Sequence, residues 1–145
     1  MSWIKTITET LHIKHKTRNP FELASHLNIN VVLWDLHEEI NGFYKYERRN
    51  KFIYINSNLN YEKQYLVCAH ELGHAVLHPR ANTPFMKRNT LLSVSRIEVE
   101  ANTFAAELII PDDLIKECDQ LTVYEIASLH NVPVEIALLK CKGLF

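Results

Sequence analysis

The sequence predicts an α+β fold in which helices pack around a small, mostly antiparallel sheet of three strands. Helical periodicity covers both ends of the 145-residue chain, while short β-branched and aromatic runs gather between residues 31 and 55. Apolar residues make up 47% of the chain, enough for one compact core. We therefore expect a single domain over residues 1–145, with the helices of residues 121–142 packed on it.

Two helices are predicted at the start of the chain. Apolar residues recur every four positions from Trp3 and indicate an amphipathic helix that ends near His15. Asn19 before Pro20 is typical of an N-cap followed by a proline at the first helical position. A second helix is therefore expected to begin at Pro20 and to end before Asn28.

The predicted strands follow these helices. Val31 to Trp34 is β-branched and aromatic, which indicates a first strand. Gly42 to Tyr46 and Phe52 to Ile55 are two further short runs, and the polar residues 47–50 separate them. Their spacing predicts a β-hairpin.

A long helix is predicted after the sheet. The apolar run before and after residue 70 indicates a buried helix that begins near Tyr61 and that Pro79 ends. Periodic positions are few from Pro79 to about Ser95, so we expect a loop there.

The rest of the chain is predicted to be helical. Arg96 to Leu108 carries a narrow apolar stripe, and Pro111 ends that helix. Further helices are expected from residue 112 toward Cys118, over residues 123–130 and over residues 134–142.

A five-residue motif in the long helix indicates a metal site. Residues 70–74 read His-Glu-Leu-Gly-His, so His70 and His74 lie one helical turn apart and about 40° around the axis. Both imidazoles can then bind one Zn²⁺, with a coordination position left for water. Glu71 is displaced by about 100° from His70, which suits a residue that holds this water rather than the ion.

A structural explanation of the motif is the alternative. In a chain with eight histidines the motif can arise by composition, and the two histidines are then hydrogen-bonded core residues. The apolar surroundings favour the metal, because ionisable groups in a buried helix are costly without a partner.

Several carboxylates are candidates for the third ligand. His78 is excluded, because it lies about 12 Å along the helix axis from the first motif histidine. The next long helix offers Glu98, Glu100 and Glu107, all at the edges of its apolar stripe. The helical periodicity excludes none of the three, but it puts Glu100 nearest the centre of the buried stripe. Each of them could instead be a solvated carboxylate at the edge of the helix.

Several segments together resemble one known family. They are residues 70–74, Leu77-His78-Pro79 and the Glu100-Ala101-Asn102 segment that continues to Pro111, with looser matches at residues 19–24 and 53–56. These segments are similar to those of the ImmA/IrrE family of metallopeptidases. The resemblance implies a minimal zincin-like fold of the gluzincin type. It also implies a metal held by the two motif histidines and by the glutamate that opens the Glu-Ala-Asn segment, here Glu100.

The resemblance implies an activity as well. The implied activity is that of a zinc-dependent endopeptidase, which would bind Zn²⁺ through His70, His74 and Glu100 and use Glu71 as the general base. Members of the family are associated with phages and mobile elements, and several cut a helix-turn-helix repressor, so such a repressor is the expected protein substrate. The group that stabilises the oxyanion stays open among His78, Arg96, Tyr124 and His130.

Two other functions compete with proteolysis. Residues 121–142 are patterned like a helix-turn-helix, which is typical of a DNA-binding regulator. The second helix of this unit is mostly apolar, however, with only Lys140 and Lys142 as basic residues, and this argues against direct contact with nucleic acid. The other possibility is a metal-containing module that binds a partner without cutting it.

Composition excludes several classes of protein. The net charge of −1 gives no general attraction to nucleic acid or to an acidic membrane. No apolar run reaches the length of a bilayer span and no secretory signal is visible, so we expect a cytoplasmic protein. Cys68, Cys118 and Cys141 form no Cys-x-x-Cys pair, which indicates reduced thiols.

Overall fold

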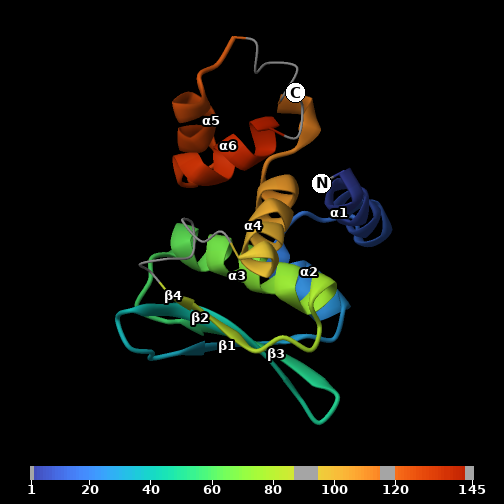
Figure 1. The fold of residues 1–145 in the computed structure, drawn as a ribbon, viewed down its shortest axis with the longest axis vertical. Coiled ribbons are helices and arrows are strands. Elements are labelled where there is room, and N and C mark those ends of the chain that lie inside the picture. Colours follow the sequence, from blue (N-terminus) through green and yellow to red (C-terminus); the bar gives the residue numbers. More distant parts are fainter. Residues whose placement is uncertain (1, 87–94, 115–119, 143–145) are drawn as a thin grey trace.

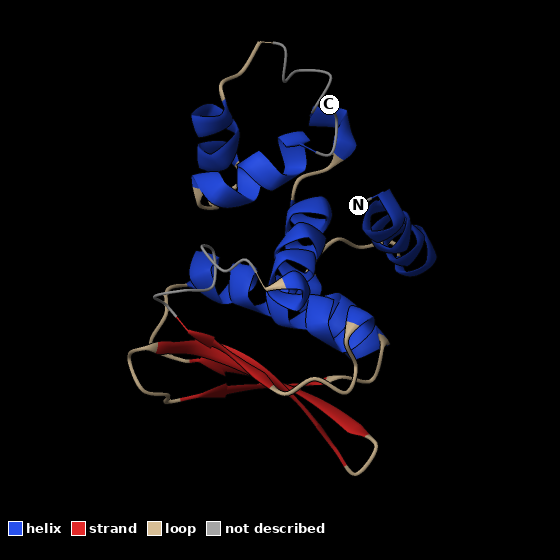
Figure 2. Cartoon of the chain, in the orientation of Figure 1, coloured by secondary structure: helices blue, strands red, loops and turns tan. Residues whose placement is uncertain are grey.

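The computed structural model describes residues 2–86, 95–114 and 120–142. Its elements are α1 (Ser2–His15), α2 (Pro20–His26), β1 (Asn30–Trp34), β2 (Ile40–Glu47), β3 (Asn50–Asn56), α3 (Tyr61–Leu77), β4 (Thr83–Met86), α4 (Arg96–Ile109), the short 3-10 helix η1 (Asp112–Leu114), α5 (Val123–Leu129) and α6 (Val134–Lys142). The helices lie on one side of the sheet (Figure 2), and the predicted α+β class is confirmed.

The sheet is mixed and mostly antiparallel, as predicted. Its strand order is β1-β3-β2-β4, where β1 runs parallel to β3 and the other neighbours are antiparallel. The described residues form four strands rather than three, because β4 lies in the segment that we expected to be a loop. The sequence did not predict this strand because it contains Pro84. A proline is tolerated in an edge strand, where one side of the backbone needs no hydrogen-bond partner.

Helix α3 lies between the sheet and α4 (Figure 1). It packs on β2 and β3 through one side and on α4 through another. The main core forms between these layers, and its largest fully buried apolar side chains include Tyr44, Phe104 and Leu72. Helix α4 also contacts α1 and α6, so its residues from Glu100 to Leu108 are buried on nearly every side.

Both ends of α3 are held by polar contacts. At its start, the side chain of Asn60 accepts a hydrogen bond of 2.9 Å from the backbone N–H of Lys63. Near its end, Lys51 Nζ donates to the carbonyl of Ala75 at 2.9 Å, and the Tyr44 hydroxyl donates to the carbonyl of Pro79 at 2.5 Å. The sheet therefore fixes the end of the helix that carries the histidine motif.

A glycine sets how closely α3 and α4 approach. A Cβ atom added at Gly73 would lie 3.1 Å from Cβ of Phe104 and 3.2 Å from Cα of Ala101. Those separations are tighter than ordinary van der Waals contact, so a larger residue would push the helices apart. Gly73 also lies between the two histidines of the motif.

The C-terminal helices have a small apolar cluster of their own. It consists of Ile110, Ile126, Ala127 and Ala137. Residues 115–119, where the predicted helix toward Cys118 would run, lie outside the described part of the chain, as do residues 87–94 of the predicted loop.

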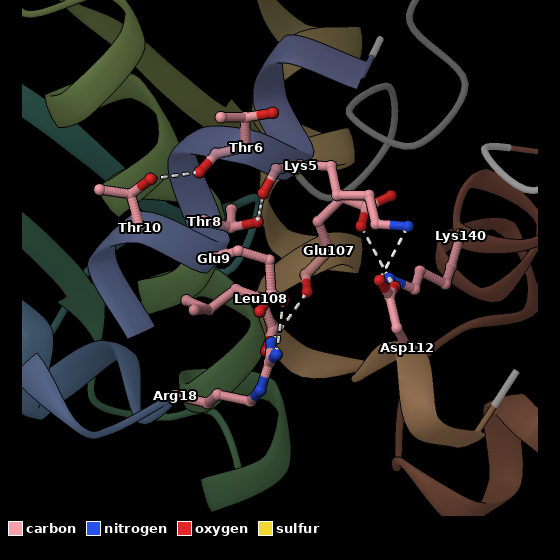
Figure 3. A network of polar contacts seen from close by, with 10 residues as sticks. All are labelled: Lys5, Thr6, Thr8, Glu9, Thr10, Arg18, Glu107, Leu108, Asp112 and Lys140. Carbon is pink, nitrogen blue, oxygen red and sulfur yellow. Dashed lines mark hydrogen bonds and ion pairs between the residues drawn. The ribbon is translucent and has the colours of Figure 1, made fainter. Parts of the chain in front are cut away.

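A buried lysine connects α6 with the rest of the protein (Figure 3). Lys140 is only 1% exposed, and its Nζ lies 2.7 Å from Oε2 of Glu107 and 2.5 Å from Oδ1 of Asp112. Asp112 also forms an ion pair of 2.8 Å with Lys5. This network joins α1, α4, η1 and α6, and Glu107 is therefore an ion-pair partner rather than a free carboxylate.

Two of the three cysteines lie in the described part of the chain. Cys68 and Cys141 are free, whereas Cys118 is outside the described part. None of the helices in residues 2–86, 95–114 and 120–142 combines the length and the apolar composition that crossing a bilayer requires.

We expect Gly73→Ala to destabilise the protein by about 1 kcal/mol, because the added methyl group overpacks the contact between α3 and α4. At an unconstrained helical site the same change would instead stabilise by about 1 kcal/mol through helix propensity. Urea unfolding of both proteins gives the difference, and an increased stability would show that the two helices have room to separate.

We expect Lys140→Ala to lower the free energy of unfolding by about 3 kcal/mol, since Glu107 is left as a buried charge without its partner. Lys142→Ala removes an exposed lysine from the same helix and should change stability by less than about 0.5 kcal/mol. Equal losses in the two variants would mean that the buried ion pair is not what holds α6 in place.

Candidate metal centre

Three side chains from two helices converge at the centre of the protein. His70 and His74 come from α3, and Glu98 comes from the first turn of α4. One ligand atom from each lies within 4.8 Å of the others. Oε2 of Glu98 is 3.0 Å from Nε2 of His70, and Oε1 is 3.0 Å from Nε2 of His74. The structure thus brings the two predicted histidines together with a carboxylate.

Glu100, which we expected as the third ligand, does not join the two histidines. Its Oε1 lies 2.8 Å from Nε2 of His78, and its Oε2 lies 3.3 Å from Nε of Arg96. Glu98 and Glu100 are two positions apart on α4, about 200° around the axis, so only one of them can face the motif. In the structure that residue is Glu98.

The burial of α4 explains why the helical periodicity favoured Glu100 over Glu98. Because α4 packs against α1, α3 and α6, apolar residues occur on several of its sides and do not mark the side that faces the motif. The contact with α3 is made through Ala101 and Phe104, which lie against Gly73. This packing places the side of α4 that carries Glu98 above the histidines.

A hydrogen bond from α4 also orients the first histidine. Nδ1 of His70 lies 2.7 Å from Oδ1 of Asn102, and both side chains are buried. With Nε2 toward the cluster, His70 carries its proton on Nδ1 and donates it to this oxygen. Sequence reasoning missed the role of Asn102. The available signal was the four-residue spacing from Glu98, which puts both residues on one side of the helix.

Glu71 is a buried carboxylate without a hydrogen-bond partner among the described residues. It is fully buried, and neither of its oxygens forms a hydrogen bond there. Its Oε1 lies 3.9 Å from Nε2 of His70, which is too far for a hydrogen bond. Burial raises the pKa of Glu71 well above 4.5, and the negative charge of Glu98 raises it further.

The electrostatics of the cluster suit a cation. Burial alone would raise the pKa of Glu98, but the close ring nitrogens of His70 and His74 lower it to about 2. Burial lowers the pKa of His74, which favours the neutral imidazole that a metal needs. The contact of His74 Nε2 with Glu98 does not have hydrogen-bond geometry, so this buried nitrogen is unsatisfied within the described part of the chain.

These residues therefore fit a bound divalent metal. Two imidazole nitrogens and one carboxylate oxygen are a usual donor set for a catalytic metal with an open position. A divalent cation would also offset the negative charge of the buried Glu71 and of the neighbouring, partly buried Glu98.

The candidates for oxyanion stabilisation lie at different distances from this cluster. Tyr124 is 72% exposed on α5. His130 lines a separate cavity of about 430 Å³, together with Tyr61 at the start of α3. His78 and Arg96 both contact Glu100. Of the four, only His78 directly contacts a motif histidine, through Nδ1 of His74 at 3.0 Å.

The chain is similar to known proteins over most of its length. The family model Peptidase_M78, described as the IrrE N-terminal-like domain, matches residues 24–142. The chain is 58% identical over 139 residues to a protein of Bacillus phage phi105 named "Uncharacterized immunity region protein 2", covering 94% of this chain and 88% of that protein. It is 31% identical over 134 residues to "Metallopeptidase ImmA" of Bacillus subtilis (strain 168), covering 90% and 79% of the two chains.

These matches confirm the family that the sequence motifs resemble. The model match includes the histidine motif, Glu98 and the whole of α4. Both relatives align with nine tenths or more of this chain. The protein therefore belongs to the Peptidase_M78, IrrE N-terminal-like family of metallopeptidases.

Proposed function

We propose that this chain is a zinc-dependent endopeptidase that binds Zn²⁺ through His70, His74 and Glu98. The observation that carries the proposal is the convergence of two buried histidines and the partly buried Glu98 beside Glu71, whose carboxylate has no hydrogen-bond partner among the described residues. Glu98 takes the place that the sequence alone assigned to Glu100, because the crossing of α3 and α4 directs Glu98 toward the histidines.

The residues of the site divide the work of hydrolysis. Zn²⁺ held by His70, His74 and Glu98 would supply Lewis acidity toward the scissile carbonyl and the attacking water. Glu71 accepts the proton of that water and delivers it to the leaving amine. Glu98 stays ionised because of its low pKa, while Asn102 keeps His70 in one orientation.

We further propose that the substrate is a helix-turn-helix repressor and that the enzyme acts in the cytoplasm. One relative is named an immunity region protein of a phage and the other a metallopeptidase, and these names are compatible with a peptidase that acts in phage immunity. The family resemblance adds the association with phages and mobile elements.

A DNA-binding role for residues 121–142 receives less support. Lys140, one of two basic residues on α6, is buried in ion pairs with Glu107 and Asp112. It is therefore not available for contact with phosphates. The remaining rival is a metal-containing module that binds its partner without cutting it.

The ligand set predicts different results for two neighbouring glutamates. Glu98→Ala should lose the stoichiometric zinc found in the wild type, because it removes one of three protein ligands. Glu100→Ala keeps all three ligands and should retain the ion at saturating zinc, with weaker binding. The zinc content of both variants is measured by elemental analysis after the proteins are loaded with zinc and desalted. Loss of the ion from Glu100→Ala alone would transfer the ligand role back to Glu100.

The role of Glu71 predicts an inactive protein that still binds metal. Glu71→Gln keeps the size of the side chain but removes the base, so cleavage should fall by roughly 10²–10⁴-fold. Cleavage of purified helix-turn-helix repressors, followed by mass spectrometry, gives the rate, and zinc content is the control. If the variant acts on the repressor as well as the wild type does while holding equal zinc, the function is binding rather than hydrolysis.

A further inference from the structure

A line of polar contacts runs from one motif histidine to the second glutamate of α4. Nδ1 of His74 lies 3.0 Å from Nδ1 of His78, and Nε2 of His78 lies 2.8 Å from Oε1 of Glu100. The side chains of His78 and Glu100 are 12% and 8% exposed, so the line is largely shielded from water. The hydrolytic chemistry described above uses neither residue.

The backbone after α3 explains how His78 reaches this place. His78 is the C-cap of the helix, with φ −132° and ψ 59°, so the chain leaves the helical path at this residue. The Tyr44 hydroxyl holds the carbonyl of the following residue, Pro79. The imidazole is thereby fixed between α3 and the side of α4 that carries Glu100.

A single arrangement of protons satisfies both hydrogen bonds. If Nε2 of His74 faces the metal, its proton is on Nδ1 and is donated to Nδ1 of His78. His78 then carries its own proton on Nε2 and donates it to Oε1 of Glu100. Each nitrogen along the line has one defined role, and the ionised glutamate is the final acceptor.

We propose that His78 and Glu100 are positioning residues, which hold the ring of His74 in the orientation and tautomer that metal binding requires. This inference rests on the proposed function, because it assigns Nε2 of His74 to the metal. It gives the two ligand histidines different supports: His70 is held by the neutral amide of Asn102, and His74 by an ionised carboxylate through a second imidazole.

The test is the zinc affinity of purified full-length variants, measured by competition with a chromogenic chelator. His78→Phe removes the acceptor for His74, and Glu100→Ala removes the last acceptor of the line, so each should weaken zinc binding by roughly 10- to 100-fold. Glu100→Gln keeps an acceptor oxygen and should lose less. His26→Gln removes an exposed histidine elsewhere and should leave the affinity unchanged.

Combining the variants separates a connected line from two independent contacts. His78→Phe together with Glu100→Ala should weaken binding no more than His78→Phe alone, since the line is already broken. Asn102→Ala acts on the other histidine, so its effect should add to that of His78→Phe. The visible spectrum of the Co²⁺-loaded proteins gives a second readout, which a purely structural role would not change.

The outcomes distinguish this proposal from the proposed function. If the wild type binds one zinc ion and His78→Phe binds it equally tightly, the positioning role is wrong and the peptidase proposal stands. Fully additive losses in the double variant would also overturn the positioning role. A wild type that binds no metal would overturn both proposals. If His78→Phe does not fold, the smaller His78→Leu also lacks an acceptor for His74 and carries the same comparison with Glu100→Ala.

Discussion

The close crossing of α3 and α4 is the constraint on which the rest of the site depends. Gly73 removes the side chain that would separate the helices, and it stands between the two histidines of the motif. At this distance one turn of α4 places Glu98 against both imidazoles and Asn102 against His70. The ligand set is therefore a product of helix packing as much as of the motif itself.

Burial determines how the charged groups that this helix crossing brings together behave. In water two histidines and two glutamates would be ordinary titrating groups, but here Glu71 is fully buried and Glu98 is only 14% exposed. Placing their charges together in an apolar interior is unfavourable unless a cation or hydrogen-bond donors compensate. The site meets this cost with partners for Nδ1 of both histidines and with a geometry that fits a divalent metal.

Helix α4 links the metal centre to the C-terminal helices. Its first turn carries Glu98, and near its end Glu107 forms the buried pair with Lys140 of α6. The same helix therefore makes polar contacts near both of its ends. For this reason three glutamates on one apparently amphipathic helix have three different partners. Glu98 faces the histidines, Glu100 contacts His78, and Glu107 contacts Lys140.

The sequence by itself determined the local features: the α+β class, nearly all helix boundaries, the spacing of His70 and His74, and the family. These depend on periodicity, caps and a contiguous motif, which act over a few residues. Only the tertiary structure decided that Glu98 rather than Glu100 faces the motif, that β4 completes the sheet, and that Lys140 is buried. Each of those outcomes depends on which side of an element meets a distant neighbour, and no local pattern specifies this for a helix that is buried all round.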